Sequence, residues 1–126
     1  MQKQEPKKIL AVVSDLFFTV KIADAAKRAG LAVEFAKDDK EALAKAKDSP
    51  LLIILDLNLQ SAQPLKLIPK LKANAETRRI SLLGFVSHVD GELKKKAQES
   101  GCNMVLARSA FSQNLPQILK RHAGVL

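Results

Sequence analysis

Short apolar runs alternate along this chain with segments in which apolar residues recur at helical spacing. This alternation predicts parallel strands joined by crossover helices. Five apolar runs are typical of strands: Ile9–Val13, Leu31–Phe35, Leu51–Leu55, Ile80–Val86 and Met104–Leu106. We therefore expect an α/β fold with a doubly wound, five-stranded parallel sheet in (βα)5 order.

Helix boundaries are also visible in the sequence. Asp38 or Asp39, Asp90 and Ser112 precede helical segments and are residue types that cap helix N-termini. The third helical segment carries a core face of Leu65, Ile68 and Leu71, with Pro69 in its first turns or at a kink.

Length and charge narrow the class of protein. The chain has 126 residues, one cysteine and a net charge of +8. We expect one domain over residues 1–126, with residues 1–6 as a flexible N-terminus. Residues 1–8 contain no apolar stretch of the signal-peptide kind, and no run approaches the roughly 20 apolar residues of a membrane span. These features favour a cytoplasmic protein without membrane contact. The basic excess is compatible with nucleic-acid binding but serves solubility equally well.

One carboxylate stands out. The most apolar run, Leu51–Leu55, ends in Asp56. Doubly wound sheets bind ligands in the crevice beyond the carboxyl ends of their strands, near the reversal of strand order. We therefore expect Asp56 to lie at that crevice.

Three short segments resemble one family. Residues 55–59, Leu-Asp-Leu-Asn-Leu, are similar to the phosphoacceptor strand and loop of the receiver domains of two-component response regulators. Ser87-His88 and residues 99–103, Glu-Ser-Gly-Cys-Asn, resemble two further receiver segments. The resemblance covers nearly the whole chain. It implies a flavodoxin-like receiver fold and a bacterial phosphorelay signalling domain, not an enzyme.

The resemblance assigns metal and phosphoryl roles to a few residues. Asp56 would be the phosphoacceptor, and Asp15, Asp56 and the Asn58 backbone carbonyl would be weak candidates for binding Mg²⁺. Either Val13-Ser14-Asp15 or Ser14-Asp15 aligns with the acids that end the first strand of receivers, and both registers leave the site short of charge. We expect no required cofactor and weak Mg²⁺ binding. Asp15 as the N-cap of the first helix is the favoured alternative.

The switch positions implied by the resemblance hold unexpected residue types. Val86 replaces the hydroxyl residue, which removes a hydrogen bond to a charged group worth roughly 1.5–3 kcal/mol. Ser87 follows it but is expected to point to the opposite face. Val105 replaces the switch aromatic, and Arg108 replaces the lysine without matching its compact ammonium group. These departures together predict a degenerate receiver, or pseudo-receiver.

The leading hypothesis is a stand-alone signalling domain that acts through phosphorylation-independent protein contacts. Its partner would be another signalling protein, bound by the fourth helix, the fifth strand and the fifth helix, as the resemblance implies. A homodimer stays open. The first alternative is an active receiver phosphorylated on Asp56 with Mg²⁺, and the second is a basic nucleic-acid-binding module.

Smaller features have competing interpretations. Phe17 pairs with Val20 at i+3 and either forms an exposed patch or joins the core, and the core is favoured. Lys94, Lys95 and Lys96 are expected on the solvated face of the fourth helix. Cys102 is expected to be a small buried apolar residue.

Overall fold

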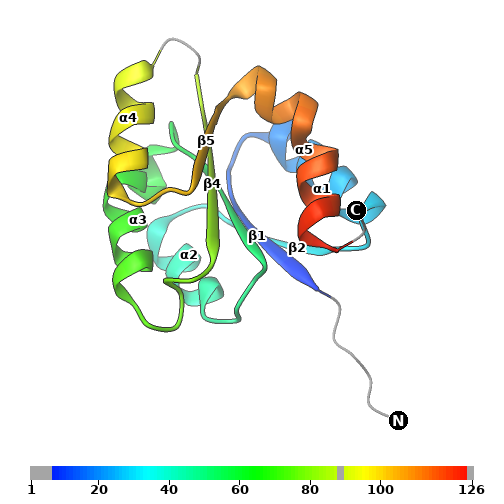
Figure 1. The fold of residues 1–126 in the computed structure, drawn as a ribbon, viewed down its shortest axis with the longest axis horizontal. Helices are drawn as coiled ribbons and strands as arrows, with labels where there is room; N and C mark the ends of the chain where they lie inside the picture. Colours follow the sequence, from blue (N-terminus) through cyan, green and yellow to red (C-terminus); the bar gives the residue numbers. More distant parts are fainter. Residues whose placement is uncertain (1–6, 88–89, 125–126) are drawn as a thin grey trace.

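The structure, a computed structural model, describes residues 7–87 and 90–124. The predicted flexible segment 1–6 and the side chain of His88 lie outside this range. Strands and helices alternate along the chain (Figure 1). The elements are β1 Lys8–Val12, α1 Leu16–Arg28, β2 Ala32–Ala36, α2 Asp39–Ala46, β3 Leu52–Asp56, the 3-10 turn η1 Gln60–Ala62, α3 Pro64–Ala73, β4 Ser81–Val86, α4 Gly91–Ser100, β5 Met104–Ala107 and α5 Arg108–His122.

The five strands form one parallel sheet in the order β2-β1-β3-β4-β5. All five predicted strands are present within one residue of their expected ends, and the (βα)5 prediction is confirmed. The strand order reverses between β1 and β3, so the crevice expected for a doubly wound sheet lies beyond the carboxyl ends of these strands. Asp56 is the last residue of β3 and lies at that edge.

Two apolar layers cover the sheet. Successive strand residues point to opposite faces, so β3 supplies Ile53 and Leu55 to one layer and Leu52 and Ile54 to the other. The first layer lies under α2, α3 and α4, and the second lies under α1 and α5 (Figure 1). Burial on both faces explains why the central strand is uninterrupted by polar residues until Asp56.

Three aspartates cap helices. The carboxylates of Asp15, Asp38 and Asp90 accept the backbone N–H of Phe18, Glu41 and Leu93 at 3.1, 2.8 and 3.2 Å, respectively. Each such cap contributes about 1 kcal/mol. The N-cap role favoured for Asp15 is therefore confirmed, and Asp38, not Asp39, caps α2.

The predicted start of the last helix is wrong. Helix α5 begins at Arg108, and Ser112 lies inside it; Ala107 stands at the N-cap without a side-chain hydrogen bond. The reason is Phe111, which is fully buried and stacks on Phe85 with ring centroids 4.5 Å apart. Burial of Phe111 extends the apolar face of Leu115 and Leu119 by one turn toward β5.

Two burial predictions also need correction. In α3, Leu67 is fully buried with Ile68 and Leu71, and Leu65 is only partly buried. Phe17 is exposed and does not join the core. The inward face of α1 is set by Phe18 and Ile22, four residues apart, and Phe17 lies about 100° away from Phe18 around the helix.

Both termini of the described chain lie at the end of the sheet where the strands begin. The Lys7 Nζ donates a hydrogen bond to the backbone carbonyl of Ala123 at 3.4 Å. Asp56, the last residue of β3, lies at the opposite end of the strands. Within residues 7–87 and 90–124, no helix has the length and apolarity needed to cross a membrane.

Candidate functional site

Asp56 is a buried carboxylate at the end of the central strand. It pairs with Phe85 of β4 in the sheet register, and only 5% of its surface is exposed. Its Oδ1 accepts the backbone N–H of Asn58 at 2.9 Å, which fixes the carboxylate against the loop that follows β3. The Asp56 side chain therefore lies in the crevice where ligands of this fold class bind.

Burial dominates the protonation of this carboxylate. Loss of hydration raises the pKa of Asp56 above its ordinary value, because the charged form is disfavoured away from water. The Asn58 N–H and the Arg108 guanidinium act in the opposite direction, and the charge of Asp15 raises the pKa further. The net effect is an Asp56 whose negative charge is destabilised in the folded protein.

Arg108 faces this carboxylate from the first turn of α5. Its Nη2 lies 3.9 Å from Asp56 Oδ2, and its guanidinium carbon lies 5.5 Å from the centre of the Phe18 ring. The Nε of Arg108 is buried and has no hydrogen-bond partner among the residues that the structure describes. The crevice thus contains a permanent organic cation, held by an ion pair and by an aromatic face.

The Asp15 carboxylate serves as a helix cap. Its Oδ1 is engaged by the Phe18 N–H at the start of α1. In the described residues, no three His, Cys, Asp or Glu side chains gather as a metal-binding group. One buried carboxylate beside a guanidinium fits Mg²⁺ poorly, because it offers few of the oxygen ligands that Mg²⁺ prefers.

The loop residue Asn58 has a structural partner. Its side-chain Oδ1 accepts the backbone N–H of Ser87 at 3.0 Å and so ties the loop after β3 to the end of β4. Ser87 follows the last residue of β4 and is partly exposed. This hydrogen bond occupies the Asn58 side chain, while the backbone carbonyl is the group that the sequence resemblance had suggested as a metal ligand.

Val86 and Val105, the residues that the resemblance aligned with switch positions, belong to the core. Val86 and Val105 are both nearly fully buried in the apolar layer under α2, α3 and α4. Neither carries a group that could hydrogen-bond a phosphoryl oxygen. The structure therefore brings Asp56 and Arg108 together, whereas Val86 and Val105 pack in the apolar core.

An aromatic cluster below Arg108 was not anticipated. Phe18 lies 4.7 Å from Phe85 and 5.9 Å from Phe111 between ring centres, on the α1–α5 side of the sheet. These three residues are far apart in sequence. The spacing of apolar residues could predict their burial but not that one ring would support the guanidinium of Arg108.

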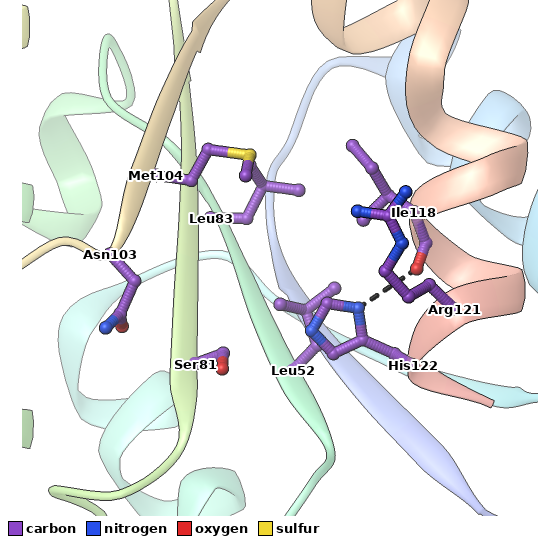
Figure 2. A pocket seen from close by; sticks show the side chains of 8 residues that line it. All are labelled: Leu52, Ser81, Leu83, Asn103, Met104, Ile118, Arg121 and His122. Atoms are coloured by element: carbon purple, nitrogen blue, oxygen red, sulfur yellow. Dashed lines mark hydrogen bonds between the residues drawn. The ribbon is translucent and has the colours of Figure 1, made fainter. Parts of the chain in front are cut away.

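A separate hollow of about 140 Å³ lies at the opposite edge of the sheet. Figure 2 shows Ser81, Leu83 and Met104 on one side of it and Ile118, Arg121 and His122 of α5 on the other. The His122 Nδ1 lies 3.0 Å from the Ile118 carbonyl, a contact within α5. This hollow adjoins the first residues of β3, β4 and β5, so it does not contribute to the Asp56 crevice.

No protein-family model and no curated protein matches this sequence. Solved structures do match its fold. Chemotaxis response regulator CheY4 of Vibrio cholerae has a TM-score of 0.79 at 24% identity, over 94% of this chain and 99% of that one. The phosphorylated cyanobacterial phytochrome response regulator RcpA has a TM-score of 0.77 at 23% identity, over 93% and 91%.

A third match is the receiver domain of sensor histidine kinase PA1611 from Pseudomonas aeruginosa, which was solved with a magnesium ion in its active site cleft. Its TM-score is 0.81 at 20% identity, over 95% of this chain and 99% of that one. The architecture is thus the flavodoxin-like (βα)5 class. Within that class, the chain has the fold of the response regulator receiver domains of two-component systems, as the segment around Asp56 predicts.

Proposed function

We propose that this chain is a degenerate receiver domain, a signalling domain that acts through protein contacts without phosphoryl transfer to Asp56. The observation that carries the proposal is the pairing of Asp56 with Arg108, at 3.9 Å, in a crevice where the Asp15 carboxylate caps α1. This arrangement keeps a candidate nucleophile but surrounds it with a fixed cation and few other acids.

The electrostatics support this function. Phosphoryl transfer to a carboxylate depends on cations that offset the developing charge. Arg108 supplies one positive charge, as a lysine would, but its planar guanidinium presents donors in a different geometry from a lysine ammonium. Burial of Asp56, which raises the pKa of its carboxyl, further weakens its ability to bind a metal.

The valines support the same conclusion. Val86 and Val105 fill core positions where a phosphorylation signal would need a hydroxyl donor and a movable ring. The missing hydrogen bond alone corresponds to roughly 1.5–3 kcal/mol of lost stabilisation for a charged ligand. A phosphoryl group on Asp56 would therefore find no side chain at position 86 to hold it.

We place the contact with another signalling protein on the face formed by α4, β5 and α5. β5 is an edge strand, and its first residue, Met104, is exposed. In α4, Lys94, Lys95 and Lys96 are exposed, and Lys96 pairs with Glu92 at 3.3 Å. The exposed Met104 and the basic surface of α4 suit a partner that presents both apolar and acidic residues.

The test compares the wild type with Asp56→Asn in the presence of Mg²⁺ and either acetyl phosphate or beryllofluoride. We expect no phosphoryl adduct by intact mass and no amide shift that saturates with Mg²⁺ in NMR titrations. An adduct on the wild type that disappears in Asp56→Asn contradicts the proposal and supports an active receiver.

The active receiver is the second candidate because Asp56 is buried at the carboxyl edge of β3 and its Oδ1 is held by the Asn58 N–H. A further variant sharpens the comparison. Arg108→Lys changes the cation while leaving Asp56 in place. If an adduct forms only in Arg108→Lys, the guanidinium itself is what blocks the chemistry, which supports the proposal.

A further inference from the structure

The hollow between the sheet and the last turns of α5, which we call the β4–α5 hollow, has an apolar floor. Its volume is about 140 Å³. Leu52 and Leu83 are buried beneath it, and Met104 and Ile118 continue the apolar lining (Figure 2). Protein interiors hold few voids larger than a water molecule, so a space of this size with an apolar floor is a candidate binding site.

Ser81 explains why the space is there. Successive strand residues point to opposite faces, so Ser81 and Leu83 both face α5. In the sheet register, Ser81 pairs with Leu52 and Leu83 pairs with Met104. The hydroxymethyl group of Ser81 is much smaller than these three neighbours, and it leaves the α5 face of the sheet unfilled at this point. The hollow is therefore a consequence of the strand sequence and register.

Hydrogen bonds hold both walls of the hollow. The Asn103 Oδ1 accepts the backbone N–H of Leu82 at 2.8 Å and the Lys72 Nζ at 3.0 Å, which fixes the start of β5 against β4. On the other wall, the His122 Nδ1 lies 3.0 Å from the Ile118 carbonyl. A carbonyl oxygen only accepts, so Nδ1 carries a hydrogen. Figure 2 shows the second ring nitrogen on the side of the ring that faces the strands, where it adds a polar atom to the hollow.

The charge at the hollow is positive. None of its eight lining residues is acidic, and the exposed Arg121 lies at its rim. Within residues 7–87 and 90–124, no acidic side chain forms an ion pair with Arg121. A carboxylate matches a guanidinium both in charge and in the geometry of two parallel hydrogen bonds. The hollow thus combines an apolar floor with a cation that suits a carboxylate.

We propose that the β4–α5 hollow binds a small aromatic monocarboxylate, with its ring against Leu52 and Leu83 and its carboxylate toward Arg121. Apolar cavities of about 150 Å³ accommodate a benzene ring. A space of about 140 Å³ therefore has the size of one ring. Inorganic phosphate fits less well, because the apolar floor cannot replace its hydration. The proposal goes beyond the signalling function proposed above and holds whether or not Asp56 accepts a phosphoryl group.

The test is an NMR titration of the full chain with sodium benzoate, followed through the backbone amides. We expect saturable shifts at residues 81–83, 104 and 118–122, with a dissociation constant in the millimolar range that suits so small a ligand. The Asn58 amide, which reports on the Asp56 crevice, should stay in place. Benzyl alcohol has the same ring without the charge and should bind about fivefold more weakly or worse.

Three variants separate the parts of the site, with far-UV circular dichroism as the check on folding. Ser81→Ile fills the hollow and should weaken benzoate about tenfold or more. Arg121→Gln removes the cation at an exposed position and should weaken benzoate about fivefold or more. Lys94→Gln is the matched control, because it removes one positive charge from an exposed residue of α4; its affinity should stay within about twofold of the wild type.

Four results would overturn the proposal. They are the absence of saturable shifts at about 20 mM benzoate, shifts centred on the Asp56 crevice, equal binding of benzyl alcohol and benzoate, and equal binding by Arg121→Gln and Lys94→Gln. If Ser81→Ile does not fold, Arg121→Gln decides, because its side chain is exposed.

Discussion

The interaction free energy between Asp56 and Arg108 tests most directly whether the two side chains form an ion pair in the crevice. The perturbation is a double-mutant cycle of Asp56→Asn, Arg108→Ala and the combined variant. At 3.9 Å, two unit charges attract by about 4 kcal/mol at an effective dielectric constant near 20. The Arg108 side chain is 42% exposed, so water screens the pair, and exposed pairs contribute roughly 0–1 kcal/mol. Because Asp56 is buried, we expect a coupling free energy near the top of that range, about 1 kcal/mol.

Arg108→Ala alone should cost more than the coupling. The variant also loses the contact with the Phe18 ring, worth roughly 0.5–1 kcal/mol, but this loss occurs in both Asp56 backgrounds and cancels in the cycle. The assay is urea unfolding followed by far-UV circular dichroism, at neutral pH, in low salt and in about 1 M NaCl. In the high-salt buffer the Debye length is about 3 Å, so the coupling should shrink. A coupling free energy of zero in low salt, or one that salt leaves unchanged, would refute an ion pair at the crevice.

Three further predictions concern stability and the site. The raised pKa of Asp56 means that the folded state holds its proton to higher pH than the unfolded state, so this carboxyl costs stability above its folded pKa and costs nothing below its ordinary value. Asp56→Asn should therefore be more stable than the wild type at neutral pH, with an advantage that fades as pH falls toward about 4; an advantage that grows on acidification would contradict the burial effect. Phe111→Ala should cost about 3–5 kcal/mol in urea unfolding, because the ring is fully buried against Phe85 and Phe18; a loss below about 1 kcal/mol would show that the cluster is not packed as described. Asp15→Ala should cost about 1 kcal/mol through loss of the α1 cap, while Asp15→Ser keeps most of that stability; equal losses in the two variants would argue for a role of the carboxylate charge itself.

The order of strands and helices was predictable from the sequence because burial on both faces of a parallel sheet demands continuous apolar runs. Leu51–Leu55 illustrates this. Because the run ends in Asp56, the sequence alone predicted that Asp56 lies at the carboxyl end of the strand, where ligands of this fold class bind. Asp15 and Asp90 were predictable as caps because an N-cap needs only a short polar side chain at the right place.

Residues whose role depends on distant partners were not predictable in this way. The start of α5 depends on Phe111 meeting Phe85, a contact between residues 26 positions apart that no local pattern contains. The support of Arg108 by Phe18 is of the same kind. For Phe17 the local pattern was ambiguous, since adjacent phenylalanines compete for one inward position and only the packed helix decides which ring turns inward.

The contact between Lys7 and the Ala123 carbonyl has a practical consequence for handling the protein. Both ends of the described chain emerge beside each other, on the side of the sheet away from Asp56 and from the first turn of α1. A surface anchor or a fused reporter attached at either end would therefore leave the Asp56 crevice and the first turn of α1 accessible to solvent. For the same reason, a short linker joining the two ends would permit a circularly permuted chain with new ends in a surface loop.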